Sequence, residues 1–158
     1  MSLDNYKNQF SRLLERQDFE PQNLIQLRTH SFQQFLETGF PTQKWENWRF
    51  TNLKKLRKET FRIAGAEDLP EKLPDLKSCE IPSVDTLVII NGHYQPELSS
   101  HPLCVTVETL LEFYQSNPQR FSENDSNPFH ALNTAFMDSG LAVTIRKNSV
   151  LEHPLRFL

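Results

Sequence analysis

Cysteine and glycine are scarce in this chain of 158 residues, which has two of the first and four of the second. Cys79 and Cys104 form no CxxC motif and belong to no recognisable set of metal ligands. A disulfide framework is therefore not indicated, and an iron–sulfur cluster, which draws on about four thiolates, is not expected on them. The glycines are isolated from one another, so a phosphate-binding loop is absent and a nucleotide-binding enzyme is disfavoured. They are Gly39, Gly65, Gly92 and Gly140.

Long apolar runs are also absent. No run approaches the ~20 residues needed to cross a bilayer, and residues 1–7 have neither a signal-peptide stretch nor an Arg-rich transit character. With 37% apolar residues, 23% charged residues and a net charge of −3, the composition is typical of one polar domain with a real core. We therefore expect a cytoplasmic protein that does not contact a membrane.

The histidines are scattered, and none is spaced from an acid or a cysteine as in a catalytic triad or a metal site. We therefore assign no catalytic, cofactor-binding or metal-binding residue and expect no enzyme. An enzyme that uses a cysteine or histidine not recognisable from spacing stays open as an alternative. The five histidines are His30, His93, His101, His130 and His153.

Residues 1–63 are predicted to form an N-terminal helical region. Tyr6, Phe10 and Leu13 recur at helical spacing on one face. Pro21 suits the first turn of a second helix, which continues through residues 24–36 and includes Arg28 in its periodic stripe. Gly39 is predicted to cap this helix in the left-handed conformation.

Residues 64–82 read as a proline-rich connector, and residues 83–158 as a mixed region of helices and strands. Residues 87–90 predict a buried strand that enters a tight turn at Asn91-Gly92. A short helix is predicted over 107–114 with Thr106 as its cap, and another begins at Asn127-Pro128 and closes at Gly140. Alternating residues then predict strands over 141–146 and 151–157.

The stretch from Trp45 to Arg62 (residues 45–62) is basic and aromatic. Together with Lys44 it holds seven basic and two acidic residues, a local charge of +5 that leaves −8 on the rest of the chain. Such a stretch suits a surface for single-stranded nucleic acid. The competing interpretation, favoured by the acidic balance elsewhere, is that the aromatic rings pack inward and the cations are solvated. A freestanding module that binds protein or nucleic acid through this segment stays open as an alternative function.

Within that stretch, Glu46 and Arg49 are three residues apart, so on a helical turn they can form an ion pair. We expect Trp48 and Phe50 to anchor the segment to the two preceding helices. Trp48 is then a buried packing residue and not a ligand contact.

Three segments in fixed order resemble the N-terminal part of the SufD family, subunits of the SUF iron–sulfur cluster assembly complex. The similarity extends from about Leu24 to Leu158, with the same proline-rich gap between the first two segments. In that family the second aromatic of the first segment is often Tyr, so any contact of its hydroxyl is missing at Phe50. The segments are Pro41-Thr42 with Glu46 and 48–53 (WRFTNL); 87–92 (LVIING) with Tyr94 and 96–99 (PELS); and 127–129 (NPF) with 131–136 (ALNTAF).

The resemblance implies an α+β chain: an N-terminal helical region followed by the first strands of a right-handed parallel β-helix, truncated. It also implies pairing with a SufB-like paralogue and binding of a SufC-like ATPase, in a scaffold role without nucleic acid. The family's residues for cluster building and ATPase docking lie further toward the C-terminus, and none maps onto this chain. Iron–sulfur clusters and ATP would be handled by the full complex, so no cofactor is expected here.

The last residues, 154–158, are apolar and extended. Two short strands with an uncovered edge invite pairing with another strand. We therefore expect either self-association through residues 141–158 or local mobility there.

Overall fold

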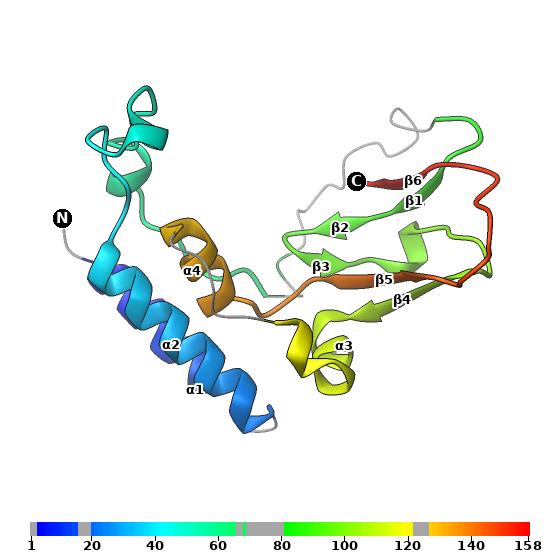
Figure 1. Cartoon of the computed structure of the whole chain (residues 1–158), viewed down its shortest axis with the longest axis horizontal. Helices are drawn as coiled ribbons and strands as arrows, with labels where there is room; N and C mark the ends of the chain where they lie inside the picture. Colours follow the sequence, from blue (N-terminus) through cyan, green and yellow to red (C-terminus); the bar gives the residue numbers. More distant parts are fainter. Residues whose placement is uncertain (1–2, 16–19, 66–67, 69–80, 122–126) are drawn as a thin grey trace. The chain divides into compact units, whose positions relative to one another are not determined.

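The computed structural model describes residues 3–15, 20–65, 68, 81–121 and 127–158. The chain divides into two compact units, drawn in Figure 1. The helical unit comprises Met1–Ile63 and Gln119–Asp138, and the strand unit comprises Ala64–Pro118 and Ser139–Leu158. Most of the predicted connector 64–82 lies outside the described residues, so the division into 1–63, 64–82 and 83–158 stays a prediction.

The helical unit is built from α1 (Asp4–Glu15), α2 (Gln22–Thr38) and α4 (Pro128–Ala135). Apolar side chains at helical spacing bury one face of each helix, which is what stabilises short helices in water. The rings of Phe10 in α1 and Phe32 in α2 stack at 4.2 Å between centroids. Helix α4 packs along α2 although about ninety residues separate them in the sequence. The shared core consists of Phe10, Leu13, Phe32, Phe35, Ala131 and Ala135.

The helix ends follow the predicted caps in part. Pro21 lies one position earlier than expected, as the residue before α2. Gly39 has the expected positive φ of 66°, but its ψ of −170° is extended, so the left-handed helical cap was wrong. Asn127 caps α4, its side-chain oxygen accepting a hydrogen bond from the Phe129 N–H at 3.0 Å. Gly140 does not close α4, which ends five residues earlier.

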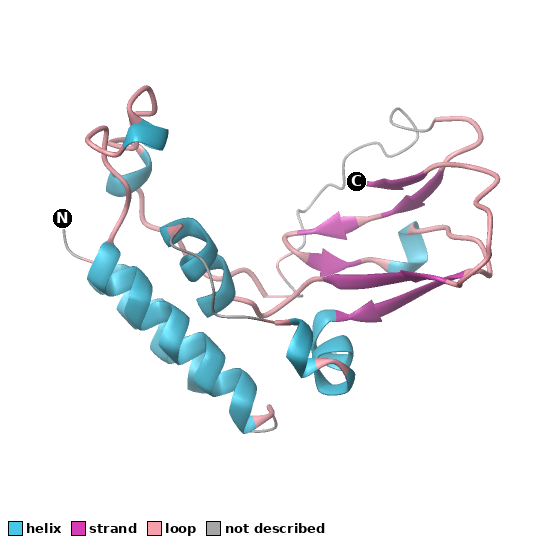
Figure 2. Ribbon diagram, in the orientation of Figure 1, coloured by secondary structure: helices cyan, strands magenta, loops and turns pink. Residues whose placement is uncertain are grey.

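The strand unit contains three two-stranded pairs and one α-helix, α3 (Leu110–Ser116), among the residues described (Figure 2). β1 and β6 run parallel, whereas β2 with β3 and β4 with β5 run antiparallel. The strands are β1 (Asp85–Leu87), β2 (Ile89–Ile90), β3 (His93–Tyr94), β4 (Val105–Thr109), β5 (Leu141–Ile145) and β6 (Leu155–Phe157). Turns of 3₁₀ helix occur at Glu46–Trp48, Leu56–Lys58, Pro96–Leu98 and Pro118–Arg120.

The turn between β2 and β3 is the one predicted from Asn91-Gly92. Both residues have positive φ, 52° and 89°. Asn and Gly tolerate that region best, and a two-residue turn of this kind matches the twist of the strands that it joins. The dipeptide therefore determined this hairpin locally.

The predicted helix over 107–114 was wrong in its first part. Val105 and Val107 belong to β4, whose β-branched side chains pair with β5, and the helix starts at Leu110. Its cap is Thr109 and not Thr106. The Thr109 hydroxyl accepts from the Glu112 N–H at 3.2 Å, and the Glu112 carboxylate accepts from the Thr109 N–H at 2.9 Å. This reciprocal pair is the T-x-x-E capping box, a signal that was present in the sequence.

Strand β1 is hydrogen-bonded along both edges. Its partner on one side is β6, with the Asp85 N–H donating to Pro154 O at 3.1 Å. On the other side Ser100 N–H donates to Thr86 O at 2.7 Å, and Ser99 accepts from the Val88 N–H at 2.8 Å. The opposite edge of β6 has no hydrogen-bonded strand among the described residues.

Candidate interaction surface

The basic–aromatic segment, residues 45–62, is fixed to the helical unit at its two ends. It follows Pro41, which is fully buried just after α2. At the other end, the Asn5 amide of α1 donates to Phe61 O at 2.8 Å, and the Gln9 side-chain oxygen accepts from the Ile63 N–H at 3.0 Å. The middle of the segment contains two short 3₁₀ turns and no longer element.

The aromatic residues of this segment do not pack inward as expected. Phe50 is 87% exposed, so the prediction that it anchors the segment to the helices was wrong. Trp45 and Phe61 are partly exposed, at 37% and 42%, and the Phe61 ring lies 6.4 Å from that of Tyr6 between centroids. Trp48 is only half-buried, and its ring contacts Phe129 of α4 at 5.2 Å between centroids. Exposed aromatic side chains are unusual enough in clusters to indicate a contact surface.

The charged residues of the segment are also directed to solvent. Glu46 and Arg49 form the predicted ion pair at 3.7 Å, but both side chains are mostly exposed, so it stabilises little. The Arg49 guanidinium also lies over the Phe50 ring, 4.7 Å from its centroid. Lys54, Lys55, Arg57 and Lys58 have no carboxylate within 4.0 Å in the part of the chain that the structure describes.

Two hollows flank Arg57, which lines both. The smaller, of about 90 Å³, lies between residues 41–43 and 51–54. The larger, of about 420 Å³, lies between the start of α1, the chain just after α2 and the end of the segment. Burial raises the pKa of Tyr6 in its wall, so this phenol is neutral at physiological pH. The larger hollow is lined by Leu3, Asn5, Tyr6, Gly39, Phe40, Arg57, Glu59 and Thr60.

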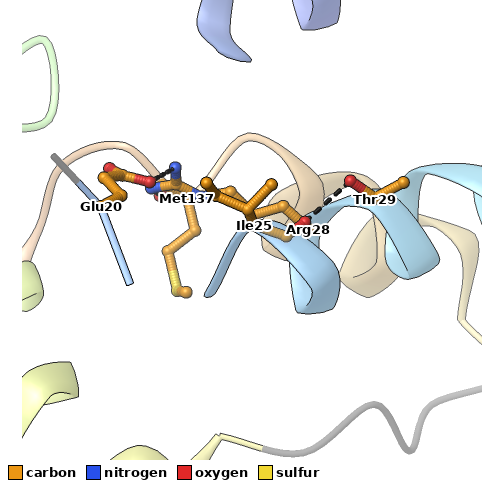
Figure 3. A network of polar contacts seen from close by, with 5 residues as sticks. All are labelled: Glu20, Ile25, Arg28, Thr29 and Met137. Carbon is orange, nitrogen blue, oxygen red and sulfur yellow. Dashed lines mark hydrogen bonds and ion pairs between the residues drawn. The ribbon is translucent and has the colours of Figure 1, made fainter. Parts of the chain in front are cut away.

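A buried ion pair in the helical unit is a feature that sequence reasoning missed (Figure 3). Arg28, 2% exposed in its side chain, donates to the Glu20 carboxylate and to Met137 O just after α4. Nearby, the Thr29 hydroxyl donates to Ile25 O at 2.8 Å. Burial raises the pKa of the Glu20 carboxyl, and the positive charge of Arg28 offsets part of that shift. The sequence feature that could have indicated this ion pair is an arginine, Arg28, at a position within the apolar stripe of α2.

The residues that bear metal-binding side chains are dispersed. Cys104 is half-buried and not in a disulfide, whereas Cys79 lies outside the described residues. Within the described ranges, no three histidine, cysteine, aspartate or glutamate side chains are grouped as metal ligands. Among the described helices, none combines the length and the apolar character that a membrane span needs.

Comparison with known proteins confirms the family that the three segments indicated. Residues 3–157 match the family model of the SufBD protein N-terminal region. The chain is 40% identical over 67 residues to the iron–sulfur cluster assembly protein SufD of Escherichia coli K12, an alignment that covers 42% of this chain and 15% of that protein. It is 28% identical over 127 residues to an iron–sulfur cluster assembly SufBD family protein of Synechocystis, covering 75% of this chain and 28% of that protein. The alignments thus cover less than a third of the length of these relatives. Because the family model covers nearly the whole chain, this protein belongs to the SufBD family.

Proposed function

We propose that the chain supplies the N-terminal region of a scaffold subunit in iron–sulfur cluster assembly, acting by protein–protein assembly with a SufB-like paralogue and a SufC-like ATPase. The observation that carries the proposal is the family match over residues 3–157. Both curated relatives bear the name of iron–sulfur cluster assembly proteins. In this role the cluster is cargo and ATP is used by the ATPase, so this chain contributes surfaces and not reacting groups.

The strand unit supports the scaffold proposal through its parallel pair. Asp85 lies opposite Leu155 and Leu87 opposite Phe157, so β1 and β6 are in parallel register. A parallel β-helix grows by adding further parallel strands at such an edge. We infer that β6 is where the β-helix of the SufBD fold continues.

The proposal is tested in the organism that encodes the protein. Deleting the gene should lower the activity of enzymes that need iron–sulfur clusters without lowering the amount of their polypeptides, and the intact gene should restore it. The tagged protein should co-purify with a SufB-like subunit and a SufC-like ATPase. Unchanged cluster enzymes together with no such co-purification would overturn the proposal.

A further inference from the structure

We propose that the basic–aromatic segment and the larger hollow beside it bind an acidic peptide segment of a partner protein, with an apolar side chain of the peptide in the hollow and a carboxylate on Arg57. The proposal rests on the surface of the helical unit alone. It does not depend on the role in cluster assembly.

The larger hollow has the size and lining of a side-chain pocket. Its volume of about 420 Å³ falls within the usual range for ligand sites. Tyr6 and Phe40 supply aromatic walls, their rings meeting edge-to-face at 5.6 Å, and Leu3 adds an aliphatic one. A Leu or Phe side chain of a partner would lose water-exposed apolar surface against these three side chains, while the polar residues of the lining face the backbone and the acidic groups of the peptide.

The wall of the larger hollow contains one cation, Arg57, and one carboxylate, Glu59, and the excess of positive charge lies along the segment beside it. Arg57 lies between the two hollows, and Lys54 lines the smaller one. Arg57 makes no ion pair with any described carboxylate, so its guanidinium is available for a two-point contact with one from a partner. Lys55 and Lys58, also exposed, extend the positive field along the segment.

Exposed rings adjoin the cations. Phe50, at 87% exposure, and Trp45 present apolar surface that folding alone leaves in water. Aromatic and arginine side chains supply most of the binding energy in protein interfaces. Among residues 42–62, only Trp48, Leu53 and Leu56 are even half-buried. Long irregular segments inside a compact domain are uncommon, and binding residues are often carried on such loops.

Charge identifies the occupant as an acidic peptide and not a nucleic acid. The segment with Lys44 carries +5, but the rest of the chain carries −8 and repels a long polyanion. Arg49 already covers one face of the Phe50 ring, which removes that face for a stacking base. A short peptide with a few carboxylates around one apolar residue needs only the cations of the segment and the hollow beside them.

The test measures fluorescence anisotropy of a labelled peptide in which one Leu is flanked by Glu and Asp residues. Three probes serve as comparisons: the peptide with Leu replaced by Ser, the peptide with its acids replaced by Gln and Asn, and a single-stranded oligothymidylate. The acidic Leu peptide should bind best, with an affinity that falls as salt is raised. Arg57→Glu should weaken it about tenfold or more, because an attraction becomes a repulsion.

Two variants separate the pocket from simple charge. Thr60 is exposed and lines the larger hollow, so the indole of Thr60→Trp should occupy part of it. This variant should bind the Leu peptide more weakly and the Ser peptide with unchanged affinity. Lys147→Glu reverses the charge of an exposed residue in the strand unit, as Arg57→Glu does in the helical unit. It should change the affinity for the acidic Leu peptide little. Circular dichroism and thermal melting confirm that each variant folds.

Three outcomes would overturn the proposal. The first is that no probe binds, or that the neutral and acidic peptides bind alike. The second is tighter binding of the oligothymidylate than of the acidic peptide, which would make the surface a nucleic-acid site. The third is self-association that Arg57→Glu abolishes in the absence of peptide binding, which would make the occupant a second copy. None of these bears on the gene-deletion test of the assembly role.

Discussion

The buried pair of Glu20 and Arg28 makes stability depend on pH in an unusual direction. The pKa of Glu20 is raised above its ordinary value of 4.5 by burial, and Asp138 raises it further, while Arg28 lowers it. The folded state therefore holds the proton at a pH where the unfolded chain has lost it. The stabilisation that the protonated Glu20 carboxyl contributes to folding is present below about pH 4.5 and is lost as pH rises through the pKa of the folded state.

We accordingly predict that wild type loses stability relative to Glu20→Gln as pH rises from below 4.5 toward neutrality. Urea unfolding at a series of pH values measures the difference. Glu37→Gln, at an exposed position of α2, controls for the loss of one charge. If the unfolding free energy of wild type instead rises relative to that of Glu20→Gln as pH increases, the attraction of Glu20 to Arg28 outweighs the cost of burying its charge.

Aromatic substitutions should rank by burial. Phe35 is fully buried, so Phe35→Ala should cost about 3–5 kcal/mol of unfolding free energy. Trp48→Ala should cost clearly less, because that ring is half-buried and its one ring contact among the described residues is with Phe129. Phe50→Ala should be close to neutral. Denaturant unfolding of the three variants checks the order, and a Trp48→Ala cost as large as that of Phe35→Ala would restore the predicted buried anchor.

Cys104 is expected to hold no iron–sulfur cluster in this chain. It is half-buried, and among the described residues it belongs to no group of three or more metal-ligating side chains. Anaerobic reconstitution with iron and sulfide should therefore leave no stoichiometric visible absorption after desalting, in wild type as in Cys79→Ser and Cys104→Ser. A retained cluster that either substitution removes would contradict this and turn the chain into a cluster carrier.

The hairpin of β2 and β3 allows a test of one element. At Gly92, φ is +89° and an added Cβ would lie 2.6 Å from the Ser139 hydroxyl oxygen. Gly92→Ala should therefore destabilise the chain by roughly 1–3 kcal/mol, from strain at positive φ together with that contact. Asn91→Gly, in the same turn, keeps the positive φ and should cost less, namely the exposed hydrogen bond from the Asn91 side chain to Asp68 O at 2.6 Å.

A double variant separates the two causes at this turn. Ser139→Gly removes the hydroxyl, so Gly92→Ala should cost less in that background by the share that the close contact contributes. An undiminished cost would assign the whole effect to backbone strain. Thermal melting of the four combinations gives the coupling between the two positions.

At the scale of the whole molecule, the edge of β6 that no described strand covers is the feature with a consequence for assembly. Pro154 and Leu158 direct their backbone groups to β1, so those of Leu155 and Phe157 face the other way. Phe157 is also 56% exposed. An exposed edge with an apolar side chain pairs readily with another strand. We predict that the chain on its own self-associates through β6.

Sedimentation velocity over a range of concentrations tests this prediction. Phe157→Lys should shift the population toward monomer, because a charge on an edge strand opposes pairing. Val150→Lys introduces the same charge at an 86% exposed residue outside the strands and should not. A monomer at all concentrations in wild type would contradict self-association through this edge.

The sequence by itself determined the features that depend on neighbours along the chain. The stripes of α1 and α2, the Asn127-Pro128 start of α4, the Asn91-Gly92 turn and the strand at residues 141–145 all agree with the structure, although burial does not alternate along that strand. Each depends on spacings of two to four residues, which the backbone geometry imposes directly. The order of the three motif segments likewise identified the family.

Only the tertiary structure decided what depends on residues far apart. The pairing of β1 with β6 joins Asp85 to Leu155, and the packing of α4 on α2 joins two stretches about ninety residues apart. Exposure of Phe50 and burial of Arg28 reverse what residue type suggests, because a side chain is buried only where another part of the chain covers it. The spacing of residues along the chain does not say which distant segment packs on a given side chain. The exposure of residues 45–62 therefore depends on how the helices of the folded unit hold that segment at its ends.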